Sequence, residues 1–63
     1  NEDALYQLGL LAVKSGQTDK AIERFKKLIS LQPLKKEYHR QLALLYSQKG
    51  DTKNAEKHAV LAR

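Results

Sequence analysis

The residues that could perform chemistry are few in this 63-residue chain, and their spacing does not favour catalysis. The chain has no cysteine, which excludes disulfides and thiolate metal ligands. His39 and His58 are nineteen residues apart, so they could act as a base or a ligand pair only if the fold brought them together. No serine has a histidine near it in the sequence, and the three glycines are too isolated to form a phosphate-binding loop. We therefore expect no enzymatic activity, no metal and no cofactor, and we expect both histidines to be exposed or partly buried.

The composition is that of a short helical segment. Leu, Ile, Val and Phe make up 16 of the 63 residues, eleven of them Leu, and Ala adds seven. Such a chain is apolar enough to fold and favours helix, although its length allows it to bury only roughly 60% of its surface. No apolar run approaches the ~18 residues of a membrane span, so we expect none. Because Met is absent even at position 1, we expect a segment of a longer protein.

The net charge of +5 raises acidic proteins, nucleic acid and anionic membranes as partners. Lys20, Arg24 and Lys27 follow one another at i, i+4 and i+7 of a predicted helix, and Glu23 is placed to pair with Lys27. No aromatic residue is interleaved with these bases, which weakens an interpretation as a single-strand binding surface. The simpler interpretation is a solvated convex face.

The chain repeats itself with a period of 34 residues. When the sequence is offset by 34, seven of the 29 comparable pairs are identical. The matching pairs are Gln7/Gln41, Leu8/Leu42, Leu10/Leu44, Leu11/Leu45, Gly16/Gly50, Thr18/Thr52 and Ala21/Ala55. A period of this length is typical of stacked helical repeats.

The first unit is predicted to fold as helix, turn, helix. Its first helix is expected to bury Ala4, Leu5, Leu8, Leu11 and Ala12 and to end at Gly16. Its second helix is expected to begin at Gln17 or Thr18 and to stop before Pro33. The apolar stripe of that helix is Ala21, Ile22, Phe25, Leu28 and Ile29.

The second unit repeats this plan. Its first helix carries Leu42, Ala43, Leu45 and Tyr46 and is broken by Gly50. Asp51 is a good N-cap for the last helix, which is expected to turn Ala55, Ala59 and Ala62 inward. The spacing therefore predicts an all-α fold of four helices, in which antiparallel helix-turn-helix hairpins stack as an α-solenoid.

The residues at fixed offsets resemble those of the tetratricopeptide repeat: Leu5, Leu8-Gly9, Gly16, Ala21, Phe25 and Pro33, then Leu42-Ala43, Tyr46, Gly50 and Ala55. The resemblance implies two tandem repeats, the first over residues 1–35 and the second, cut short before its Pro, over residues 36–63. Gly9 and Ala43 are small where paired helices approach, and Phe25 fills the space beside them. His39 stands where a bulky apolar residue is usual and Ala59 replaces the second aromatic, so we expect looser packing in the second unit.

The resemblance also implies a concave groove that receives a peptide or an amphipathic helix. Carried over by position, the groove residues are Asp3, Tyr6, Leu10, Val13, Lys14, Glu37, Arg40, Leu44, Ser47 and Gln48. Tyr6, Leu10 and Val13 also form a second apolar stripe on the first helix, which would otherwise pack on neighbouring repeats. Tyr6 and Leu10 stand where chaperone-binding members carry a carboxylate clamp, so an apolar anchor fits better than a clamp.

We therefore expect a protein-interaction module with a scaffold or adaptor role in a larger protein. The alternative is a purely structural segment that stacks on further repeats or on a second copy as a homodimer. An isolated unit of two repeats would have an exposed apolar end at the last helix, near Ala59, Val60 and Leu61, and self-association would cover that end. Binding of an acidic partner or nucleic acid through the basic convex face ranks third.

Overall fold

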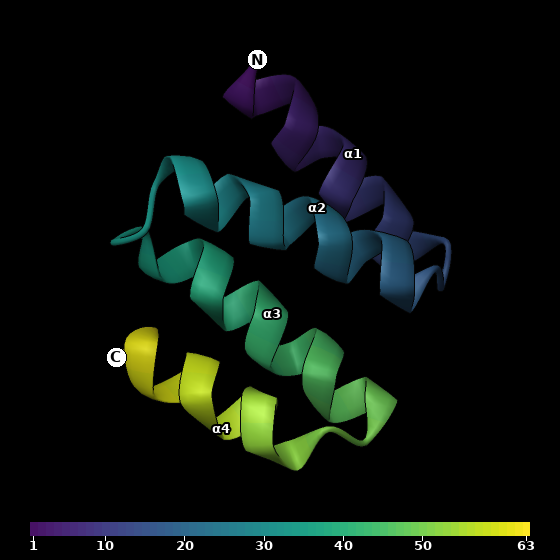
Figure 1. The fold of residues 1–63 in the computed structure, drawn as a ribbon. Coiled ribbons are helices and arrows are strands. Elements are labelled where there is room, and N and C mark those ends of the chain that lie inside the picture. Colours follow the sequence, from purple (N-terminus) through teal and green to yellow (C-terminus); the bar gives the residue numbers. More distant parts are fainter.

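The computed structural model describes all 63 residues and confirms the all-α fold. Its four helices are α1 (Glu2–Lys14), α2 (Thr18–Leu31), α3 (Lys36–Lys49) and α4 (Thr52–Leu61). Figure 1 shows that each helix reverses the direction of the one before it, so that α1 and α4 lie at opposite ends of the stack. The helix α2 packs on both α1 and α3, whereas α4 packs on α3. No helix is long and apolar enough to cross a membrane.

The predicted ends of the helices are confirmed at each turn. Gly16 and Gly50 have φ of +74° and +84°, a left-handed conformation that glycine adopts without the penalty of a Cβ. The helix α2 ends at Leu31, two residues before Pro33. The Asp51 carboxylate caps α4 by accepting from the backbone N–H of Asn54 at 3.2 Å.

The core lies between α2 and its two neighbours. Its largest fully buried side chains are Phe25, Leu28, Leu42 and Leu45. A Cβ added at Gly9 would lie 2.9 Å from Cε2 of Phe25, closer than packed carbon atoms come. This distance confirms that the first hairpin needs a minimal side chain at position 9, because the Phe25 ring fills the space.

The face that α1 turns to the core differs from the predicted one. Leu8 and Leu11 are 46% and 58% exposed and Ala4 is exposed as well, so the predicted burial of these three residues is wrong, whereas Ala12 is buried as predicted. Tyr6, Leu10 and Val13 instead pack against the core cluster. The physical reason is that α1 has a helix on one side only, and the Leu8 and Leu11 side is left uncovered.

The last helix also differs from expectation, because α4 contributes no fully buried residue. Ala55 and Ala62 are half-buried, but Ala59 is exposed, which corrects its predicted inward position. The small side chain of Ala59 buries too little apolar surface to pack α4 against α3 in the way that Phe25 packs α2 against its neighbours. Val60 and Leu61 are 55% and 48% exposed, as the sequence predicted.

Candidate peptide-binding surface

Three aromatic rings join α1, α2 and α3 beneath the predicted groove. The ring centroids of Tyr6 and Tyr38 lie 5.6 Å apart, and that of Phe25 lies 6.0 Å from Tyr6 and 6.2 Å from Tyr38. The Tyr6 hydroxyl donates a hydrogen bond to the Glu37 carboxylate, which raises the pKa of Tyr6. Two predicted groove residues, one from α1 and one from α3, are therefore brought together.

The carboxylate of Glu2 ties the start of α1 to the turn before α3. It accepts from the Tyr38 hydroxyl at 2.7 Å and from Gln32 Nε2 at 3.2 Å, and Lys35 Nζ lies 3.7 Å away. The Tyr38 hydrogen bond is the main cause of the lowered pKa of Glu2. Burial, followed by the hydrogen bond to Glu2, raises the pKa of Tyr38 to about 12. These contacts fix α1 relative to α3.

The ten predicted groove residues divide by exposure. Tyr6, Leu10 and Val13 are half-buried against the core. The other seven are exposed: Asp3, Lys14, Glu37, Arg40, Leu44, Ser47 and Gln48. Leu10 and Lys14 line a hollow of about 280 Å³ with Gln7 and Leu11. No hollow of the surface is lined by residues of both α1 and α3.

The burial of Tyr6 and Leu10 changes how the groove can be tested. Both side chains pack on the core, and the Tyr6 ring contacts Phe25 edge-on with an interplanar angle of 85°. Their replacement by Ser would remove packing as well as any contact with a partner. Exposed positions such as Leu44, 57% exposed, separate binding from folding.

The fold brings His39 and His58 together, which the sequence analysis did not predict. His39 is only 5% exposed, and its ring stacks on that of His58 with centroids 5.2 Å apart. The Tyr46 ring stacks on His58 in turn, at 5.7 Å and 11°. The expectation of an exposed or partly buried side chain is therefore wrong for His39, whereas His58 is half-buried in agreement with it.

Two polar contacts hold the rings of this pair in place. Nε2 of His39 lies 2.8 Å from the carbonyl oxygen of Pro33, which can only accept, so this nitrogen carries a proton. The contact between the two rings joins Nδ1 of His39 to Nδ1 of His58 at 3.0 Å, so one of these nitrogens donates and the other accepts. Burial is the main cause of the lowered pKa of His58, and the charges of His39, Lys57 and Lys26 add to it.

The repeat pattern of the sequence could have predicted the contact between His39 and His58. The 34-residue offset places His39 and His58 at the positions of Leu5 and Arg24. Equivalent positions of two repeats occupy the same place in each hairpin. Any contact expected between Leu5 on α1 and Arg24 on α2 therefore predicts one between the two histidines.

Family models of the tetratricopeptide repeat match residues 3–34 and residues 37–60. The chain belongs to the tetratricopeptide repeat family. Each match spans one hairpin, so the two tandem repeats that the 34-residue period predicted are confirmed. No curated protein and no solved structure matches the chain at a significant level. Tetratricopeptide repeats are in general protein–protein interaction modules.

Proposed function

We propose that this tetratricopeptide repeat unit binds a peptide or an amphipathic helix of a partner protein on the surface formed by α1 and α3. The observation that carries the proposal is the exposure of Leu44, 57%, among the exposed polar residues Arg40, Ser47 and Gln48 of α3. An apolar side chain that its own fold leaves uncovered can anchor a partner when further apolar surface adjoins it.

Further apolar surface lies on α1, which runs beside α3. The helices α1 and α3 run in the same direction, and the Tyr6–Glu37 hydrogen bond brings residue 6 level with residue 37. Val13 lies two turns after Tyr6 on α1, and Leu44 lies two turns after Glu37 on α3. Val13 is half-buried and Lys14 is exposed. A partner segment with an apolar anchor, and with carboxylates placed near Lys14 and Arg40, would suit this surface. Such binding is in keeping with a scaffold or adaptor role and involves no catalysis.

The test uses variants at exposed positions. Prey captured by the protein is identified, purified and titrated by calorimetry against the Leu44→Ser/Arg40→Ser variant. We expect the double substitution to weaken binding at least about tenfold, because it removes an apolar anchor and a charge. Leu34→Ser is the matched control, since Leu34 is 92% exposed between α2 and α3. Equal affinity of the double variant and the control for the prey would remove the α1–α3 surface from the proposal.

A structural role is the second candidate, and the exposed Val60 and Leu61 of α4 favour it. In that role the unit stacks on neighbouring repeats or on a second copy through its apolar ends. Light scattering across protein concentration distinguishes the two candidates. A mass that rises with concentration and returns to the monomer in Val60→Ser/Leu61→Ser supports the structural role, and a strict monomer contradicts self-association.

A further inference from the structure

We propose that the outer face of the α1–α2 hairpin docks an acidic amphipathic helix of a partner protein. This face consists of Leu5, Leu8 and Leu11 on α1 and of Lys20, Arg24 and Lys27 on α2. It is a different surface from the one formed by α1 and α3, and it does not depend on the function proposed for that surface.

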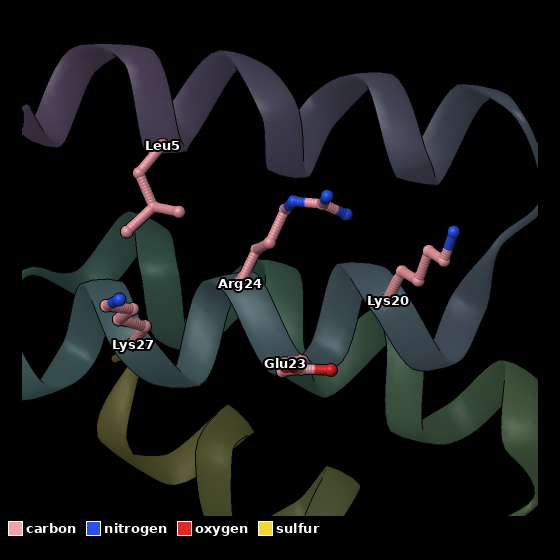
Figure 2. Close-up of a pocket in the computed structure, with 5 residues that line it drawn as sticks. All are labelled: Leu5, Lys20, Glu23, Arg24 and Lys27. Atoms are coloured by element: carbon pink, nitrogen blue, oxygen red, sulfur yellow. The ribbon is translucent and has the colours of Figure 1, made fainter.

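The face combines apolar side chains with a hollow. Leu8 and Leu11 are 46% and 58% exposed, and Leu5 is half-buried. Leu5 lines a hollow of about 330 Å³ with four charged side chains of α2. Figure 2 shows Leu5 pointing from α1 toward α2, and Lys20 and Arg24 reaching from α2 toward α1. Arg24 also lines the adjoining hollow of about 130 Å³ beside Leu8 and Leu11. The face is thus continuous from α1 to α2.

The three cations of this face have no partner within the molecule. The ion pairs of the protein join Lys35 to Glu2 and Lys49 to Asp19. Glu23 forms none with Lys27, which corrects the predicted helix-supporting pair. Arg24 is half-buried yet its guanidinium makes no hydrogen bond or ion pair with the protein. A ligand with carboxylates is the complement that these groups lack.

The second repeat indicates what kind of element covers such a face. Leu8 and Leu11 correspond, at the 34-residue offset, to Leu42 and Leu45. Those two leucines are 0% and 1% exposed because α2 packs over α3. Ile22 and Phe25 of α2 belong to the same core cluster as Leu42 and Leu45, and Ile29 packs against that cluster. These three side chains form an apolar stripe at i, i+3 and i+7 of α2. A helix with the same stripe would cover Leu8 and Leu11.

The charge of that helix follows from the residues on α2. At the positions of Lys20, Arg24 and Lys27 the second repeat has Asn54, His58 and Leu61, of which none is a permanent cation. A neutral helix laid over the first hairpin would take three cations partly out of water without pairing them, which is unfavourable. Asp or Glu residues flanking the apolar stripe would remove that penalty. The occupant is therefore acidic.

A second copy of the chain does not meet these requirements. Its second repeat has Glu56, Ala59 and Arg63 at the positions where α2 has Ile22, Phe25 and Ile29. No bulky apolar stripe would therefore face Leu8 and Leu11. Two copies, each with a net charge of +5, would also repel one another. A partner protein supplies both the stripe and the charge.

The experiment titrates the isotope-labelled 63-residue protein with synthetic helical peptides, followed by amide chemical shifts. The probe peptide has Ile, Phe and Ile at i, i+3 and i+7 with flanking Glu, and the control peptide has Gln at every Glu. We expect the probe to shift the amides of Leu8, Leu11 and Arg24. Three exposed charge pairs at 0.2–1 kcal/mol each would make the control bind about tenfold more weakly, and added salt should reduce the difference.

Two variants assign the contacts. Leu8→Ser/Leu11→Ser should weaken the probe at least about tenfold while leaving the helical spectrum intact, because both side chains are exposed. Arg24→Glu should weaken the probe and narrow its advantage over the Gln peptide, because the charge of the face falls from three cations to a net charge of +1. This loss of charge preference is an effect that general loss of stability would not produce.

Several outcomes would overturn the proposal. Equal binding of the Glu and Gln peptides would exclude an acidic ligand. Shifts confined to Leu44 and Arg40 would support the α1–α3 surface and refute this face. A dimer that Leu8→Ser/Leu11→Ser dissociates would assign the face to a second copy. Protection of the same amides by residues that precede Asn1 in a longer polypeptide would assign it to an intramolecular helix.

Discussion

The two hairpins of this protein follow one pattern, yet equivalent leucines have opposite surroundings in each. Leu42 and Leu45 on α3 are buried, whereas Leu8 and Leu11 on α1 are about half exposed. The residue types are the same and the helices are built in the same way. The difference is that α2 covers α3 and no helix of the structure covers α1. In a stack of repeats, burial depends on the neighbouring repeat as well as on the residue itself.

The interiors of the two hairpins also differ. The first is filled by Phe25, which packs against Gly9, and the second has Ala59 and Ala43 at these positions. The second hairpin is joined instead by the stacked rings of His39 and His58. One hairpin therefore depends on an aromatic side chain in a tight space, and the other depends on a polar contact that responds to pH.

The largest expected effect comes from removing the aromatic side chain that distinguishes the first hairpin. Phe25 is 0% exposed and contacts both Tyr6 and Tyr38. We expect Phe25→Ala to lower the free energy of unfolding by ~3–5 kcal/mol, measured by urea denaturation. Ala59→Gly, at the equivalent exposed position, is the control and should cost only about the 1 kcal/mol of helix propensity. A loss below about 1 kcal/mol for Phe25→Ala would remove this residue from the core.

The equivalent leucines provide the next comparison. Leu42→Ala should cost ~2–5 kcal/mol because the side chain is fully buried. Leu8→Ala should stay within about 0.5 kcal/mol, as is usual for an exposed position on a helix. The same urea experiment measures both. Equal losses for the two variants would show that Leu8 is covered in solution, and the contrast between the hairpins would then disappear.

Gly9→Ala should have a smaller effect. The new Cβ would lie 2.9 Å from Cε2 of Phe25, so the ring must shift within a filled core. Overpacking costs ~1–3 kcal/mol, and the gain in helix propensity offsets up to about 1 kcal/mol, leaving a net loss of about 1 kcal/mol. Thermal melts of Gly9→Ala with and without Phe25→Leu test the cause. The loss should shrink when the ring is absent, and an unchanged loss would contradict the steric explanation.

The smallest expected effect is the pH dependence of the second hairpin. The pKa of His58 is lowered from 6.5 in the folded protein, mainly by burial. The unfolded chain therefore binds a proton first as pH falls, so stability declines below about pH 6.5 until the folded pKa is reached. Melting temperatures at about pH 7.5 and 5.5 measure this decline. His58→Gln should reduce the decline, and the same decline in wild type and variant would exclude His58 as its cause.

The helices and turns could be predicted from the sequence because their signals are local. Gly16, Gly50 and Pro33 determine where helices end, and these residues act through their own backbone. Phe25 was recognised as core because its stripe has helical spacing and a small residue opposite. Each of these predictions needs only the chain within one hairpin.

The faces of α1 could not be predicted from the same information. Leu8 and Leu11 have the spacing of buried leucines, and only the absence of a covering helix leaves them exposed. Tyr6 and Leu10 were assigned to a groove by analogy, although contact with Phe25 and Tyr38 depends on how three helices meet. The contact between His39 and His58 likewise depends on the approach of α3 and α4. Helical periodicity shows which residues share a face of a helix, but not which other helix will cover that face.

The absence of buried residues on α4 has a consequence for how the molecule opens. All eight residues of the hydrophobic core lie on α1, α2 and α3, and α4 is held chiefly through α3. Detachment of α4 would therefore leave this core assembled, as a sub-global unfolding event of low free energy. The amide protons of α4 should exchange with solvent by this route, ahead of those of α2. Each such event would also release His58 from the burial that lowers its pKa, so protonation of His58 and fraying of the last helix are coupled.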